Sequence, residues 1–258
     1  KEREANKSGI FVYEEEMGST AVLCLAAIVC YMLSAITASS AQWKSATATK
    51  SKDTDSSIAT EGACGFGDLH KTSYGTYSTA LSGILFNRGS SCGACFELRS
   101  GTSSIVLTAT DFCAPNYALP PDNGGWCNFP RAHFQIPDSS FSLLTKDTVD
   151  PIHIHYRRVR CERKGGIRFT LKGNAYFMQV LVTNVGLDGQ VVGLKVKGSR
   201  TGWAPMARNW GQNWQLNINL AGQPLSFELT TSTRKTLASY NVAPQNWNFG
   251  QTFSGKQF

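Results

Sequence analysis

The sequence predicts a mainly β protein of two domains, in which disulfide bonds crosslink only the first. Six of the eight cysteines lie between Cys64 and Cys161, and none follows Cys161. Beyond a turn at 172–174, short apolar segments are separated by turn residues at fairly regular spacing, which is typical of a β-sandwich. The expected strands are 177–185, 191–197, 214–220, 225–231 and 236–242. The charged, glycine-containing stretch at 163–173 is the expected connection between the domains.

Residues 1–41 are expected to be an upstream extension followed by a secretory signal peptide. An apolar run over 21–36 follows Met17 and is short for a membrane span but typical of the hydrophobic region of a signal peptide. Small residues at 38–41 favour cleavage after Ala41, so the predicted signal peptide covers 17–41. Glutamates at 14–16 stand where a basic region belongs, which indicates Met17 as the true start. The alternative is a signal anchor that stays in the membrane, which would make the protein membrane-associated.

Secretion changes the meaning of the cysteines. Cys24 and Cys30 leave with the signal peptide, and the other six are an even number in an oxidising compartment, so three disulfides are expected. No metal and no other cofactor is expected. The pair Cys92 and Cys95 has the spacing of zinc ligands but lacks a second such pair or suitably spaced histidines.

The mature chain is basic. Loss of residues 1–41 removes three basic and five acidic residues and raises the formal net charge from +7 to +9. A basic secreted protein meets acidic surfaces, and uronate-bearing polysaccharides are one candidate partner. Nucleic acid is not an expected partner, because the protein is secreted and no run of lysine and arginine contains interleaved aromatic residues.

Local patterns predict the elements of the first domain, which is expected to cover 61–165. Residues 42–60 precede it, and because they are polar with few apolar anchors they are expected to form a loosely held N-terminal arm. A helix is predicted over 74–87, since apolar residues at 80, 81, 84 and 85 share one face. Apolar and β-branched residues predict strands over 105–110, 152–159 and 167–171. Residues 115–130 are expected to form a long loop, and 139–145 a short helix.

Several motifs resemble those of the expansin family, and within it the alpha-expansins of plant cell walls. The resemblance covers roughly residues 62–258, and the motif Gly-Gly-Trp-Cys-Asn at 124–128 points to the alpha class. The other motifs of the first domain are GACGFG at 62–67, SCGACFE at 91–97, TATDFC at 108–113 and YRRV at 156–159. Those of the second are KGSRTGW at 197–203, RNWGQNW at 208–214 and FGQTF at 249–253.

The resemblance implies a fold, a location and a function. It implies a six-stranded double-psi β-barrel, like that of family-45 endoglucanases, followed by an immunoglobulin-like β-sandwich over 174–254 that binds cellulose. A protein of this kind is a secreted monomer of the plant cell wall. It loosens the wall without hydrolysis, by disrupting non-covalent contacts between cellulose microfibrils and matrix glucans such as xyloglucan.

The resemblance also selects one disulfide pattern from the fifteen that six cysteines allow. The implied pairs are Cys64–Cys92, Cys95–Cys161 and Cys113–Cys127. The family usually carries two further cysteines between Cys95 and Cys113, and here both are absent, so no thiol is left without a partner.

The groove that the resemblance implies has lost a catalytic carboxyl. Glycosidases of this architecture need two carboxyl groups, one as general acid and one to activate water. The family's His-Phe-Asp motif reads His133-Phe134-Gln135 here, and glutamine cannot ionise. Asp111 keeps the other acidic position, and Thr47 is what remains of the family's groove-lining strand. We therefore expect a non-enzymatic groove of Thr47, Asp111, His133 and Gln135, although Asp111 and His133 have the simpler interpretation of hydrogen-bonded structural residues.

Aromatic side chains of the second domain predict a sugar-binding platform. Flat rings stack on the apolar face of a sugar ring, and a linear platform needs about three of them. By motif match the candidates are Trp210, Trp247 and Phe177, with Tyr176 as the alternative third, whereas Trp203 and Trp214 fit the core equally well. Two other functions stay open: a wall-polysaccharide-binding protein that has lost loosening activity and, disfavoured by Gln135, an endoglucanase.

Overall fold

The structure is a computed structural model, and it describes residues 42–51, 62–69, 72, 74–146 and 149–258. The predicted extension, signal peptide and alternative membrane anchor lie outside these residues, as does the rest of the predicted arm at 52–60. Within the described ranges, no helix has both the length and the apolar character needed to cross a membrane.

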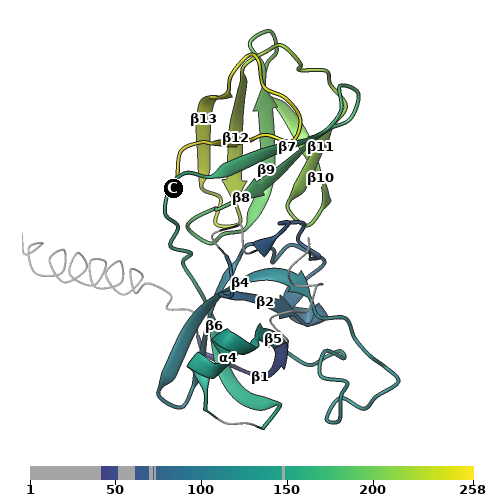
Figure 1. The fold of residues 1–258 in the computed structure, drawn as a ribbon, viewed down its shortest axis with the longest axis vertical. Coiled ribbons are helices and arrows are strands. Elements are labelled where there is room, and N and C mark those ends of the chain that lie inside the picture. The colour runs from purple at the N-terminus through teal and green to yellow at the C-terminus, as the bar shows by residue number, and fades with distance from the viewer. Residues whose placement is uncertain (1–41, 52–61, 70–71, 73, 147–148) are drawn as a thin grey trace, which may run out of the picture. The chain divides into compact units, whose positions relative to one another are not determined.

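The first domain is a closed barrel of six strands (Figure 1). The strands are β1 (Lys44–Ser51), β2 (Ser78–Leu81), β3 (Cys95–Ser100), β4 (Ser103–Phe112), β5 (His133–Pro137) and β6 (Ile152–Val159). Their order around the barrel is β1-β5-β2-β4-β3-β6, in which β1–β5 and β2–β4 run parallel and the other neighbours antiparallel. Alternate residues point inward and form one apolar core, in which the rings of Phe96, Phe134 and Tyr156 contact one another.

The barrel begins earlier than predicted, because the supposed arm supplies β1. Residues 44–51 contain few apolar side chains, yet this strand pairs with β5 on one side and β6 on the other. Its alanines Ala46 and Ala48 enter the core, while the alternating Thr47 and Thr49 are also buried. The prediction of a loosely held arm is therefore wrong for this segment. Thr47 and Thr49 are hydrogen-bonded to His133 and buried, whereas Lys44 and Ser45 at the start of the strand are exposed.

The predicted helix over 74–87 is also wrong in its first half. Strand β2 occupies residues 78–81, all four of which are buried, and only the short α3 (Gly83–Phe86) is helical. A fully buried strand has no face exposed to solvent, so its side chains need not alternate between apolar and polar, and hydrophobic periodicity cannot distinguish it from a helix. The short helix α4 (Asp138–Leu144) agrees with its prediction within one residue at each end.

The second domain is a β-sandwich whose two layers share one strand (Figure 1). Its strands are β7 (Arg168–Gly173), β8 (Met178–Thr183), β9 (Val191–Lys197), β10 (Ala204–Trp210), β11 (Asn213–Leu216), β12 (Leu225–Thr231), β13 (Thr236–Ala243) and β14 (Thr252–Ser254). The first half of β10 pairs with β9, and its second half pairs with β11. Phe169 of β7 and Phe227 of β12 stack with their ring centroids 4.4 Å apart and join the two layers at the centre of the core.

This architecture confirms the predicted fold class of a six-stranded barrel followed by a β-sandwich. The sandwich begins at β7, before the predicted start at residue 174. The three disulfides join Cys64 to Cys92, Cys95 to Cys161 and Cys113 to Cys127, which are the pairs that the resemblance implies.

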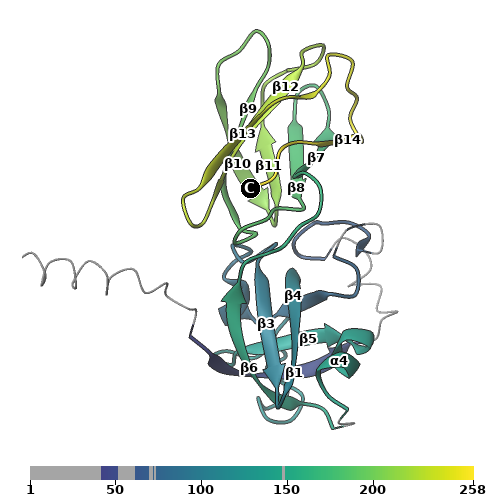
Figure 2. The same ribbon diagram turned by 90° about the vertical axis from the view of Figure 1, so that its left-hand side faces the viewer.

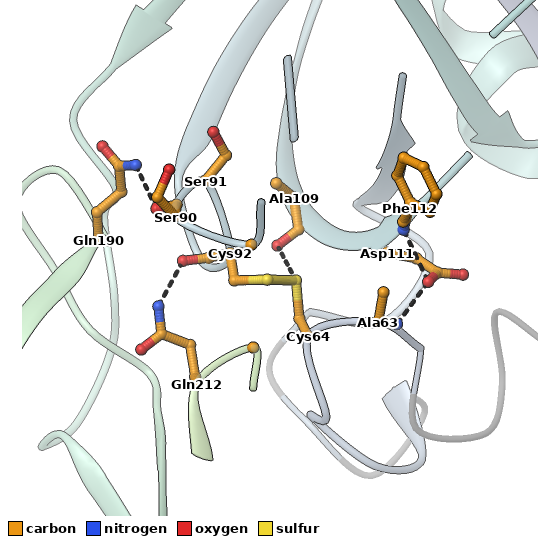
Figure 3. The surroundings of a disulfide bond; sticks show 12 residues. Ala63, Cys64, Ser90, Ser91, Cys92, Ala109, Asp111, Phe112, Gln190 and Gln212 are labelled. Atoms are coloured by element: carbon orange, nitrogen blue, oxygen red, sulfur yellow. Dashed lines mark hydrogen bonds between the residues drawn. A yellow bond between two sulfur atoms is a disulfide. The ribbon is translucent and has the colours of Figure 1, made fainter. Parts of the chain in front are cut away.

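Hydrogen bonds link the sandwich to the part of the barrel around the Cys64–Cys92 disulfide (Figure 3). The buried side chain of Gln212 donates from Nε2 to the carbonyl of Cys92 at 2.9 Å, and its backbone N–H donates to the carbonyl of Cys64 at 3.0 Å. Gln190 donates in the same way to the carbonyl of Ser90. The two domains are thus joined by specific contacts as well as by the connecting chain.

Candidate functional site

Strand register places the two positions of the expected carboxyl pair in one row across the barrel. Asp111 of β4 lies opposite Ala80 of β2, Ala80 lies opposite Gln135 of β5, and Gln135 lies opposite Thr49 of β1. The neighbours Leu81, Phe134 and Ala48 belong to the apolar core. Because successive side chains of a strand point to opposite faces, Ala80, Gln135 and Thr49 point away from that core, and a register shift between Thr79 and Ala80 brings Asp111 into their row.

The row of Asp111 and Gln135 lacks the acid–base chemistry of a glycosidase. The two residues are two strands apart, which corresponds to about 9.5 Å between their backbones. Inverting glycosidases use two carboxyl groups, one as general acid and one as general base. With glutamine at one of the two positions, the row holds one carboxylate and one neutral amide. It can hydrogen-bond sugar hydroxyls, but it lacks an acid–base pair.

Asp111 is a half-buried carboxylate held by the backbone. Its Oδ1 accepts hydrogen bonds from the N–H groups of Ala63 at 2.6 Å and Phe112 at 2.8 Å (Figure 3). Burial raises the pKa of Asp111, and the two backbone hydrogen bonds act against that rise. The chain can approach this closely because residue 62 is glycine at φ +41°, where an added Cβ would lie 2.9 Å from the carbonyl oxygen of Thr110. Asp111 thus orders the loop at 62–65 in addition to lying in the row.

His133 is a structural residue and not an accessible groove residue. Its side chain is completely buried, and the two ring nitrogens are hydrogen-bonded to the hydroxyls of Thr47 and Thr49, each at 2.8 Å. Burial, together with the nearby Arg131, lowers the pKa of His133 to about 4, so the ring is neutral at neutral pH. Thr47 is only 9% exposed and is engaged by this contact. Thr47 and His133 therefore lie on the same strand face as Gln135, but both are buried there, and their side chains join β1 to β5.

The three aromatic residues predicted to form a platform are not brought together. Trp247 is 7% exposed, packs edge-on against Phe249 and donates from Nε1 to the carbonyl of Gln223 at 2.9 Å. It belongs to the sandwich core and cannot stack on a sugar. Trp210 is 41% exposed, but its ring lies against Gly65 of the barrel, so near that an added Cβ there would be 2.8 Å away. Phe177 is half-buried in the turn before β8, at the opposite end of that strand from the residues paired near Trp210.

Two aromatic residues of the sandwich are more accessible than Trp210, Trp247 and Phe177: Tyr176, which was the alternative third candidate, and Tyr240, which was not predicted. Tyr176 is 87% exposed at the β7–β8 turn, and Tyr240 of β13 is 61% exposed. Tyr240 contacts Trp203 edge-to-face with the centroids 6.0 Å apart, and the ammonium of Lys197 lies 6.0 Å from the Trp203 ring. Trp214 is buried in the core under the guanidinium of Arg208. Polar and apolar residues do not alternate along 236–242, so no local pattern marks Tyr240 as outward-facing, and nothing local distinguishes Trp203 from Trp247.

The described part of the chain contains no cluster of potential metal ligands. Among those residues, no three His, Cys, Asp or Glu side chains are placed to hold one ion. Cys92 and Cys95, the pair with zinc-ligand spacing, are bonded to two different cysteines.

Comparisons with known proteins identify a family model and several relatives that match this chain. The family model "Expansin C-terminal domain" matches residues 167–244. Expansin-A13 of Arabidopsis thaliana is 50% identical over 234 residues, which is 87% of this chain and 88% of the relative. Expansin-A10 of Oryza sativa subsp. japonica is 49% identical and covers 84% of this chain and 87% of its own length.

Solved structures with the same fold come from a bacterium. The crystal structure of an apo expansin from Clavibacter michiganensis has a TM-score of 0.67 at 14% identity and covers 84% of this chain and 98% of its own. A mutant of the Clavibacter michiganensis expansin, crystallised in complex with cellohexaose, has a TM-score of 0.65 at 14% identity. At this level of identity, the likeness concerns the fold.

Proposed function

This chain belongs to the expansin family, among its A-type members, and on that premise we propose that it loosens plant cell walls by binding cellulose and matrix glucans without cleaving them. The observation that carries the non-hydrolytic part is the row in which Asp111 and Gln135 flank Ala80. Its composition excludes the usual pair of carboxyls.

In this proposal the barrel binds a glucan and the sandwich binds cellulose. The carboxamide of Gln135 can both donate to and accept from sugar hydroxyls, while Asp111 can only accept when ionised. For the sandwich, the exposed rings of Tyr176 and Tyr240, with the half-buried Trp203 beside Tyr240, are the better stacking candidates. Trp210 is exposed but lies against Gly65, and Phe177 is half-buried, so these two remain secondary candidates. A relative of the same fold crystallised with cellohexaose supports the sugar class.

The proposed setting is the extracellular plant cell wall, where the protein acts as a monomer and xyloglucan-like polymers are the matrix partner. Three disulfides in a chain of this size fit an oxidising compartment. Secretion would follow from the signal peptide expected at 17–41.

The test compares creep of heat-killed wall strips at acid pH with the release of reducing sugar from soluble glucan. The native mature chain is expected to produce creep and no sugar release above that of buffer. Sugar release by the native chain, abolished by Asp111→Asn, would overturn the non-hydrolytic proposal.

A second candidate function is wall binding without loosening, which the glutamine at position 135 favours. The variant Gln135→Asp restores the carboxyl of the family motif, and Gln135→Asn is its matched control, with the same shortened side chain and no charge. If only Gln135→Asp produces creep while all three proteins bind cellulose equally, the chain is a binding protein that has lost loosening activity.

A further inference from the structure

One outer face of the barrel gathers basic side chains that the proposed glucan row does not use. We call it the basic face and define it by Arg99 of β3, His153, His155 and Arg157 of β6, and Arg160 and Arg163 after β6. Strand β6 alternates, with Ile152, Ile154 and Tyr156 in the core, so His153, His155 and Arg157 point outward. Strands β3 and β6 lie side by side (Figure 2), and their register places Arg99 directly opposite His155.

Acidic residues do not balance this face. Glu97 of β3 forms an ion pair with Arg157, whose Nη2 lies 2.6 Å from Oε2, and it also accepts from Ser104. Glu162 is the other acid nearby, and Arg160 and Arg163 stand beside it. Arg99 and Arg160 have no ion-pair partner among the described residues. The excess of positive charge therefore indicates an anionic ligand.

Two hollows follow one another along β3 on this face. One, of about 370 Å³, is lined by Trp43, Arg99, Gly101 and His155. The other, of about 440 Å³, contains Glu97 and Val159 in its wall together with Tyr77, Arg160 and Arg163. The Glu97–Arg157 ion pair belongs to the β3–β6 positions between them. Their succession along a strand suits an extended chain better than a compact ligand.

The cationic groups of both hollows are held in position. The guanidiniums of Arg157 and Arg99 lie 4.7 Å and 5.9 Å from the ring centroid of Trp43. In the second hollow, Arg163 lies over the ring of Tyr74 and donates from Nη2 to the hydroxyl of Thr108 at 2.8 Å. Among the described residues, the buried Nε of Arg163 has no hydrogen-bond partner. Guanidiniums fixed in this way lose less freedom when they bind a carboxylate.

The basic face is separate from the row of Asp111 and Gln135. That row crosses β4, β2, β5 and β1, whereas the basic face lies on β3 and β6, the two remaining strands of the closed order. A glucan in the row and a ligand on the basic face would therefore contact different sides of the barrel.

We propose that the basic face binds an acidic polysaccharide, a chain of uronate residues whose carboxylates meet Arg99, Arg160 and Arg163. Carboxylate is the group that guanidinium recognises with two parallel hydrogen bonds. The apolar faces of the sugar rings would meet Tyr77, which is 52% exposed at the second hollow. Recessed hollows favour a flexible chain over the flat surface of an anionic membrane. The inference goes beyond cellulose and neutral matrix glucans as partners.

The test measures binding of the mature chain to polygalacturonate, with fully methyl-esterified polygalacturonate as the uncharged probe of the same backbone. Arg99→Gln with Arg160→Gln removes one exposed cation from each hollow. Lys235→Gln with Lys256→Gln is the matched control, because it removes two exposed cations from the sandwich. One contact between unit charges in water corresponds to about a fivefold difference in affinity. Loss of two such contacts is therefore expected to weaken binding of the Arg99→Gln, Arg160→Gln variant about 25-fold, with little change for the lysine control.

The outcomes separate this proposal from the proposed function and from other partners. Binding should also weaken as salt rises, since screening shortens the reach of surface charges to about 10 Å at 0.1 M. Equal losses in both variants would overturn the proposal in favour of a diffuse effect of net charge, and equal binding of the esterified polymer would exclude carboxylate recognition. Binding to phosphatidylserine vesicles that depends on Arg99 and Arg160, without binding to polygalacturonate, would assign the face to a membrane instead. Cellulose binding and creep are measured on the same proteins, so a failure here leaves them unaffected.

Discussion

Replacing His133 should flatten the pH dependence of barrel stability. An unfolded histidine takes up its proton near pH 6.5, whereas burial lowers the pKa of His133 to about 4. Between these values the unfolded chain binds a proton that the folded chain does not. Stability contributed by neutral His133 is therefore complete above pH 6.5, falls as the pH decreases, and stops falling below pH 4.

The magnitude follows from the two pKa values. At about 1.4 kcal/mol for each pH unit between them, the full loss is about 3 kcal/mol, of which about 2 kcal/mol should occur between pH 7 and pH 4.5. No discount for solvent screening applies, because the side chain is completely buried. Asp111 acts in the opposite direction, since its raised pKa favours the protonated folded state. It is present in both proteins and cancels in their difference.

The variant is His133→Gln, which keeps a hydrogen-bonding group but cannot ionise. The assay is native-state hydrogen exchange of the β1 and β5 amides at pH 7 and 4.5, corrected for intrinsic exchange, which reports the free energy of opening the barrel itself. His133→Gln should be less stable at pH 7 but lose about 2 kcal/mol less on acidification. The exposed His155→Gln is the control and should behave like the native chain. A pH dependence in His133→Gln equal to that of the native chain would refute the reasoning.

Three further predictions follow from the packing and the crosslinks. Trp247→Ala should destabilise the sandwich by about 3–5 kcal/mol in urea unfolding, whereas Trp210→Ala should cost about 1 kcal/mol; similar losses would contradict their different burial. Cys113→Ser with Cys127→Ser should cost about 3 kcal/mol in the same assay and expose the loop between them to proteolysis, and an unchanged cleavage pattern would show that the loop is held by other contacts. Gln212→Ala leaves the carbonyl of Cys92 without its donor and should cost about 1–3 kcal/mol, seen in calorimetry as separate melting of the two domains; a single unchanged transition would argue against the role of this contact.

The sandwich was predictable because its strands have one buried and one exposed face. The predicted bounds of 191–197 and 225–231 coincide with β9 and β12, and 236–242 differs from β13 by one residue. The segment 236–242 was predicted because turn residues bound it, whereas in 191–197 and 225–231 apolar side chains largely alternate with polar ones, which is the signal that hydrophobic patterning detects. Strand 152–159 of the barrel coincides with β6 for the same reason.

The sequence-based predictions failed where polar side chains are buried or where an aromatic side chain was expected on the surface. Thr47 and Thr49 are buried in β1 because they hydrogen-bond His133, which is distant in sequence, so no local pattern could reveal the strand. The row of Asp111 and Gln135 likewise depends on contacts between segments that are distant in sequence. Asp111 and Gln135 were each identified from a motif, but their position on either side of Ala80 depends on the barrel closing in the order observed. Trp247 was misassigned because local sequence does not show which face of a sandwich a tryptophan occupies.

Gln212 has a mechanical consequence for a protein that works in a wall under tension. It contacts the carbonyls of both Cys64 and Cys92, which a disulfide joins to each other (Figure 3). A load on the sandwich is therefore passed to two anchor points of the barrel that are themselves covalently tied, and it does not rest on the connecting chain alone. Force applied to the sandwich would thus be carried to the side of the barrel where Asp111 fixes the neighbouring Ala63.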